Sequence, residues 1–133
     1  MALSRGTAKR GTQERDYEAQ YHWLLDWIDS AALIEKEFLA FLHSNDLRLP
    51  DHAQYRPSDE VPVQTDFYYE RDGLPGICIF IDGPTHDKAS QETNDRNLRE
   101  SLEDRGLMVV TIRYDRSIAE QCEEHKAVFA PGK

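Results

Sequence analysis

A continuous apolar run, residues 77–81, is the feature that most constrains the fold of this chain. The run is too short for a buried helix and is rich in isoleucine, so it predicts a strand. A strand without polar alternation is covered on both faces, which places it inside its sheet. The run continues into Asp82 and Gly83, and His86 follows three residues later. An Asp-Gly pair is an ordinary turn, but the carboxyl ends of such strands are also where open α/β sheets carry their chemistry.

The charge of the chain is acidic and unevenly distributed. The formal charge is −9 over 133 residues, a length that fits one domain. Residues 1–15 hold four basic side chains against one acid, so residues 16–133 carry a charge of −12. Such a surface binds nucleic acid poorly without specific contacts. It is compatible with a divalent cation held between carboxylates, or with a larger assembly that supplies the positive surface.

Two further features bear on the expected location of the protein. No apolar run reaches the ~20 residues of a transmembrane helix, and the N-terminus lacks the apolar segment of a signal peptide. Cys78 and Cys122 show no metal-binding or redox spacing, so we expect both to be free thiols. These features predict a cytoplasmic protein that does not enter a membrane.

Hydrophobic periodicity and turn residues predict the secondary structure. Helices are expected over residues 15–29, 31–44, 87–105 and 117–126, and strands over residues 53–56, 61–70, 77–81 and 107–113. Residues 1–14 are expected to be a disordered basic tail or linker, residues 15–126 a single domain, and residues 127–133 a C-terminal tail.

The connections between these elements predict the fold class. The turn at Arg71–Gly73 makes the second and third strands antiparallel neighbours. The helical crossover makes strand 107–113 parallel to strand 77–81. Ser30 is the expected N-cap of the second helix. We therefore expect an α/β (α+β) fold, with a small mixed sheet flanked by helices.

Two tryptophans, Trp23 and Trp27, lie four residues apart on the first expected helix, on the face opposite its main apolar stripe. A helix with apolar residues on two faces is packed on both sides or presents one of them to a partner. We expect both indoles to be only partly covered, which leaves a protein-interaction domain as a minor interpretation.

One acid, Glu37, falls within the apolar stripe expected for helix 31–44, three residues after Ile34 and four before Phe41. An unpaired carboxylate is costly to bury. Glu37 either reaches water at the edge of the stripe, which is the commoner arrangement, or points from the helix towards a charged site on the sheet.

Asp66 lies on the polar face of strand 61–70, and Asp82 ends the following strand. An antiparallel hairpin is able to bring the two carboxylates to the same edge of the sheet. Two acids, a backbone carbonyl and water are ligands that suit Mg²⁺, and His86 is suited to act as general acid or base. Each residue taken alone is more commonly structural, so the argument depends on their joint occurrence.

These residues belong to a longer ordered pattern. It runs through Asp66-Phe67 on one strand, Asp82-Gly83-x-x-His86 after an apolar strand, Asp95 and Arg99 on a helix, and Gly106 before an apolar strand that ends in Arg113-Tyr114. The pattern resembles the restriction-endonuclease-like PD-(D/E)XK superfamily, and within it the very-short-patch-repair-type branch. It looks particularly like the version found at the C-terminus of some DEAD/DEAH-box helicases.

The resemblance covers residues 31–120 and implies an αβββαβ restriction-endonuclease-like core. It also implies a hydrolase that cleaves DNA with Mg²⁺ or Mn²⁺, with DNA and a helicase domain or complex as partners. The implied catalytic residues are Asp66, Asp82, His86 and Glu37. The implied metal ligands are Asp66, Asp82 and the carbonyl of Ile81, with Asp95 and Arg99 supporting the site from the following helix.

One position departs from the family pattern. Many relatives place a metal-binding Glu two residues before the strand-ending acid, where this chain has Phe80, and the lysine of the motif is also missing. Two hypotheses therefore stand. The first is a Mg²⁺-dependent DNA endonuclease; the second is a catalytically inactive nuclease-fold module for docking or DNA positioning. The first hypothesis is favoured by the joint presence of five polar residues that we expect at one site: Glu37, Asp66, Asp82, His86 and Asp95. The second is favoured by Phe80 and by the acidic charge of the chain.

Overall fold

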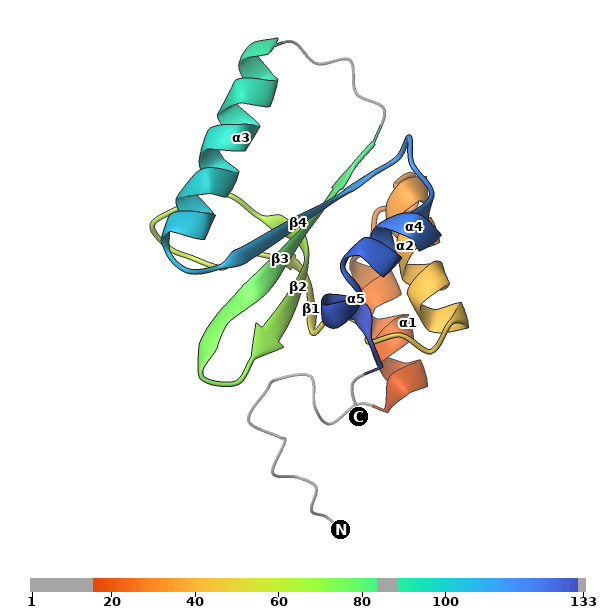
Figure 1. The fold of residues 1–133 in the computed structure, drawn as a ribbon. Coiled ribbons are helices and arrows are strands. Elements are labelled where there is room, and N and C mark those ends of the chain that lie inside the picture. The colour runs from red at the N-terminus through yellow and green to blue at the C-terminus, as the bar shows by residue number, and fades with distance from the viewer. Residues whose placement is uncertain (1–15, 84–88, 132–133) are drawn as a thin grey trace.

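The computed structural model describes residues 16–83 and 89–131, in which helices flank a four-stranded sheet (Figure 1). The elements are α1 (Tyr17–Trp27), α2 (Leu33–Ser44), β1 (His52–Tyr55), β2 (Thr65–Arg71), β3 (Leu74–Asp82), α3 (Ala89–Asp104), β4 (Met108–Arg113), α4 (Ile118–Glu124) and α5 (Lys126–Phe129). The expected mixed sheet with flanking helices is confirmed.

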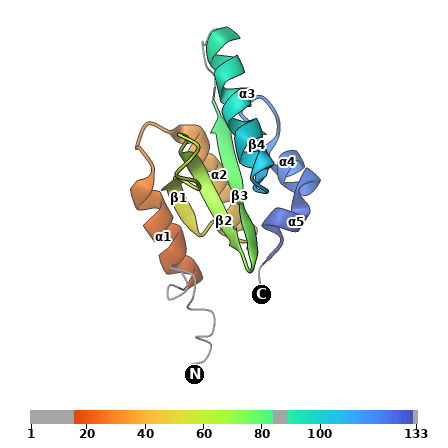
Figure 2. The ribbon, with the colours of Figure 1, turned by 90° about the vertical axis from the view of Figure 1, so that its left-hand side faces the viewer.

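The strands lie side by side in chain order, β1-β2-β3-β4 (Figure 2). β1 pairs with β2, and β2 with β3, in antiparallel register, whereas β3 and β4 are parallel. Gly73 has φ +72° in the turn between β2 and β3, a conformation that favours glycine. The predicted hairpin and the predicted parallel crossover are both confirmed.

Two separate apolar cores cover the two faces of the sheet. Ile77, Ile79 and Ile81 of β3 pack into the core beneath α1, α2, α4 and α5, while Cys78 and Phe80 pack into the smaller core beneath α3. Figure 1 shows α3 alone on one side of the sheet and the other helices on the opposite side. The prediction that this apolar run is buried on both faces is therefore confirmed.

Two local predictions were wrong. Residues 127–129 belong to α5 and not to a C-terminal tail, because the Phe129 ring is buried and packs edge-on against Phe38 and Tyr69, with centroid distances of 5.7 and 5.8 Å. Ser30 does not cap α2. The helix begins after Ala32 without a side-chain cap, and the Asp29 carboxylate accepts a hydrogen bond from the Ala31 amide instead, at 2.9 Å.

Several surface and side-chain predictions are confirmed. Trp23 is half-buried and Trp27 is 50% exposed, and their rings meet edge-on with centroids 5.9 Å apart. Both cysteines are buried free thiols, and burial raises the pKa of Cys78 to about 12. Within residues 16–83 and 89–131, none of the helices has the length and apolarity needed to cross a bilayer.

Candidate functional site

The regular pairing of β2 with β3 stops next to Asp66. The last paired residues are Phe67 and Ile79, and the following amide, that of Ile81, donates its hydrogen bond to Asp66 Oδ2 at 2.7 Å. A side-chain carboxylate thus takes the place of a backbone carbonyl in the ladder. The carboxylate is fixed in position at the point where the two strands separate.

β1, the other neighbour of β2 in the sheet, also has an irregular backbone, opposite Asp66. In the β1–β2 register, Ala53 pairs with Phe67 and Tyr55 with Thr65, so Gln54 lies opposite Asp66. Gln54 has φ +56°, a left-handed conformation that is strained for a residue with a Cβ atom. Backbone strain of this kind concentrates at functional sites, where the surrounding structure holds it.

The strain at Gln54 gives a stability prediction. We expect Gln54→Gly to be about 1 kcal/mol more stable than Gln54→Ala, since glycine adopts positive φ without a Cβ penalty. Both variants lose the exposed hydrogen bond between the Gln54 and Gln64 amides, so comparing them isolates the backbone effect. Urea denaturation measures the difference. Equal stability of the two variants would show that the conformation carries no strain.

Glu35 of α2 meets Asp66 at this place. Burial raises the pKa of Glu35 to about 7, reinforced by the charge of Asp66, a hydrogen bond with that carboxyl group and the charge of Asp29. Burial also raises the pKa of Asp66, and the charge of Asp82 adds to this, while hydrogen bonds from Ile81 and Glu35 oppose it. The two carboxyl groups therefore share a proton more readily than isolated acids do.

Glu37, which the resemblance implies as a catalytic residue, is exposed, so the hypothesis that it points from the helix towards a charged site on the sheet was wrong. The residues of α2 buried against the sheet are Phe38, Leu39 and Leu42. Glu35 lies three and four residues before the first two of these, which places it on the same helical face. Leu33, by contrast, is apolar but 66% exposed, so the apolar residues of α2 do not all lie on its buried face.

Asp82 lies beside this pair and is bound by Arg99 of α3. The guanidinium donates to both carboxylate oxygens of Asp82, at 3.0 and 3.4 Å, and to Thr111 Oγ1 at 2.9 Å. It also stacks on the Phe80 ring, 4.2 Å from the centroid. Phe80 therefore forms the platform that holds the arginine, and the arginine balances the charge of Asp82.

For the remaining predicted site residues, Ile81, Asp95 and His86, the structure does not test the predicted role. Ile81 contacts Asp66 through its amide, so metal binding by its carbonyl stays a prediction. Asp95 is exposed on α3, one helical turn before Arg99. His86 lies outside the described residues. The structure thus brings together Asp66, Asp82 and Arg99 from the predicted set.

The side chains around Asp66 can be compared with the ligands that a metal ion requires. Among the described residues, no group of three or more His, Cys, Asp or Glu side chains is placed to hold a metal ion. Mg²⁺ commonly uses only one or two carboxylates and keeps several waters. Glu35 and Asp66 offer oxygen donors of this kind, next to a third carboxylate that Arg99 already neutralises. The residues therefore fit a hydrated ion better than a closed protein cage.

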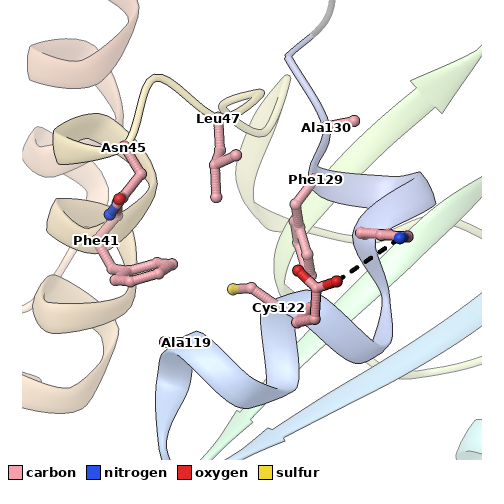
Figure 3. A pocket seen from close by; sticks show the side chains of 9 residues that line it. Phe41, Asn45, Leu47, Ala119, Cys122, Phe129 and Ala130 are labelled. Atoms are coloured by element: carbon pink, nitrogen blue, oxygen red, sulfur yellow. Dashed lines mark hydrogen bonds and ion pairs between the residues drawn. The ribbon is translucent and has the colours of Figure 1, made fainter.

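A cavity of about 340 Å³ lies elsewhere, between the C-terminal end of α2 and helices α4 and α5 (Figure 3). Phe41, Leu47, Cys122 and Phe129 line it, and the ion pair between Glu123 and Lys126 lies at its side. The cavity includes none of the acids described above. It is therefore separate from the candidate site.

Comparisons of the chain with protein-family models, with curated proteins and with solved structures found no match.

Proposed function

We propose that the protein is a DNA endonuclease that hydrolyses phosphodiester bonds with Mg²⁺ or Mn²⁺. The observation that carries the proposal is the meeting of Glu35 and Asp66 where β2 and β3 separate, with Asp82 beside them. Carboxylates are rarely brought together unless a cation, a proton or a function compensates their repulsion. A cation-assisted reaction on an anionic substrate is the chemistry that this arrangement supports best.

Each residue has a role in the proposed reaction. Asp66 and Glu35 would hold the hydrated cation, which when bound supplies a Lewis acid for the phosphate and lowers the pKa of a bound water. The Ile81 amide fixes the rotamer of Asp66, so the carboxylate is oriented before substrate binds. Asp82, held by Arg99, and the predicted residue His86 would position the attacking water.

The order of the elements also supports the proposal. From α2 to β4 the chain runs α, β, β, β, α, β, with Asp82 at the end of β3 and Asp66 near the start of the antiparallel strand β2. This agrees with the core that the resemblance to PD-(D/E)XK nucleases implies. A link to a helicase domain, which the same resemblance implies, is part of the proposal.

An inactive nuclease-fold module is the second candidate. It is favoured by Phe80, which occupies the position where many PD-(D/E)XK nucleases have a metal-binding Glu. The Arg99 guanidinium stacks on the Phe80 ring. In such a module, the Glu35–Asp66 pair would serve only to join α2 to the sheet.

A cleavage assay separates the two candidates. Supercoiled plasmid and single-stranded DNA are incubated with the full chain in Mg²⁺, in Mn²⁺ or in EDTA. The endonuclease is expected to cleave in either metal and not in EDTA, and Asp66→Ala is expected to abolish cleavage. Cleavage that survives in EDTA or in Asp66→Ala contradicts the proposal, and no cleavage under any condition favours the docking module.

A further inference from the structure

An exposed aromatic side chain, Tyr114, lies at the same end of the sheet as the acids. Its backbone amide donates to the Asp82 carbonyl at 3.0 Å, one residue beyond the end of β4, and its side chain is 49% exposed. Figure 1 shows the connection from β4 to α4 at the end of the sheet where β3 also terminates. The backbone of Tyr114 is therefore anchored next to the candidate site, while much of its ring remains open to solvent.

Two exposed guanidinium groups accompany Tyr114. Arg113 makes hydrogen bonds with both carboxylate oxygens of Asp115, at 3.0 and 2.9 Å, and Arg116 forms an ion pair with Glu124. Their side chains are 53% and 41% exposed. Hydrogen bonding to Asp115 raises the pKa of Arg113, and the charge of Asp82 also contributes. Arg113 is also the register partner of Asp82 in the parallel pairing of β3 and β4, which places it next to the candidate site.

We propose that Tyr114, Arg113 and Arg116 form a binding surface for a nucleic-acid strand with unpaired nucleotides. The inference rests on the proposed function and names the substrate class of that site. The Tyr114 ring offers a stacking platform for a base, and the two arginines lie on either side of it in the chain to contact phosphates. A base stacked on Tyr114 would lead its strand past Asp82 to the Glu35–Asp66 pair.

Charge argues for an unpaired strand over an intact duplex. Duplex binding depends on neutralising many phosphates, and this chain carries a formal charge of −9. Arg99 is held by Asp82, and the ion pairs of Arg113 and Arg116 are exposed and therefore weak, so these two arginines can contact phosphates but do not match the many phosphates of a duplex. Stacking of a base on an aromatic ring does not require a positive surface, and every base has a face that can stack. A duplex hides the base faces that Tyr114 would contact.

Equilibrium binding to labelled DNA tests the proposal, with a 15-nucleotide mixed-sequence strand and its duplex as probes in EDTA. The full chain is expected to bind the single strand more tightly than the duplex. Tyr114→Ala is expected to weaken single-strand binding about tenfold, which corresponds to about 1.4 kcal/mol, and to leave duplex binding unchanged. Tyr114→Phe is expected to keep the affinity, because it retains the ring.

Two controls make the test specific. Met108→Ala removes another exposed apolar side chain from the opposite end of β4, and it should bind as the unchanged chain does. Arg113→Gln should reduce the salt slope of single-strand binding by about 0.7, the value for one lost phosphate contact.

The outcomes are distinguishable from those of the cleavage assay, since binding is measured without metal. Tighter duplex binding, or unchanged affinity in Tyr114→Ala, overturns the binding surface even if cleavage depends on Asp66. Absence of any binding to either probe overturns it as well. Loss of cleavage in Asp66→Ala together with intact single-strand binding supports both proposals.

Discussion

Glu35→Gln is expected to lower metal-dependent cleavage by tenfold or more, whereas Glu37→Gln is expected to leave it unchanged. The two glutamates are two residues apart on α2, but Glu35 is hydrogen-bonded to Asp66 and Glu37 is exposed. A glutamine at position 35 keeps the shape and can still donate to Asp66, but it removes a charge that would help to hold the cation. Tenfold corresponds to about 1.4 kcal/mol of barrier.

In EDTA, which removes divalent metal ions, Glu35→Gln is also expected to change the pH dependence of the free energy of unfolding. Because the pKa of Glu35 is about 7 in the fold and near 4.5 in the unfolded chain, the folded state retains a proton that the unfolded state loses between these values. This contribution to stability is fully present below about pH 4.5 and is lost as the pH rises to about 7.

Glu35→Gln removes this titration. It should therefore be as stable as the unchanged protein at pH 4.5, and more stable at pH 8, by on the order of 1 kcal/mol after allowing for the half-exposed position of Glu35. Urea denaturation at the two pH values, in EDTA, measures the gap. A gap that is equal at both pH values, or one that Glu37→Gln reproduces, would contradict the assigned position of Glu35.

Gly76→Ala is expected to destabilise the fold by about 3 kcal/mol or more, a decrease in Tm of roughly 10 °C or more. A Cβ atom on Gly76 would lie 2.5 Å from the Tyr69 carbonyl oxygen, and closer still to the Tyr68 hydroxyl group. The register of β2 and β3 shifts beside this position, and the Gly76 amide donates to that hydroxyl at 3.1 Å. Because one of the clashes involves backbone, a side-chain rotation cannot relieve it.

Gly83→Ala is the matched control for this prediction. The added Cβ would lie 3.8 Å from Ile34 Cγ2, an ordinary contact, so its effect should stay within about 0.5 kcal/mol. Thermal denaturation of both variants gives the comparison. If Gly76→Ala melts within a few degrees of Gly83→Ala, the close approach of the Tyr69 carbonyl to Gly76 is wrong.

The sequence by itself determined the layered α/β arrangement, because its signals are local. The continuous apolar run of residues 77–81 requires cover on both faces, Gly73 marks a tight turn, and Gly106, with φ +89°, follows the end of α3. Each signal depends on the nearest few residues along the chain. The strand directions follow from them, since short turns join antiparallel strands and helical crossovers join parallel ones.

The tertiary structure decided which acids meet. The strand order allowed Asp66 and Asp82 to lie at one edge without fixing their register, and the choice between Glu35 and Glu37 depends on the rotation of α2 about its axis. That rotation is set by the packing of Phe38, Leu39 and Leu42 against residues distant in sequence. Glu35 and Glu37 are two positions apart, so they point in directions that differ by about 200° around the helix axis.

The interactions that tune the site also required the structure. The Ile81 amide reaches the Asp66 carboxylate only because the β2–β3 pairing ends at Phe67, and the stacking of Arg99 on Phe80 joins α3 to β3 across the smaller core. The buried position of Phe129 is a further example, since a four-residue helix has no periodicity to detect. Such contacts link residues far apart in the chain, and no local pattern encodes their geometry.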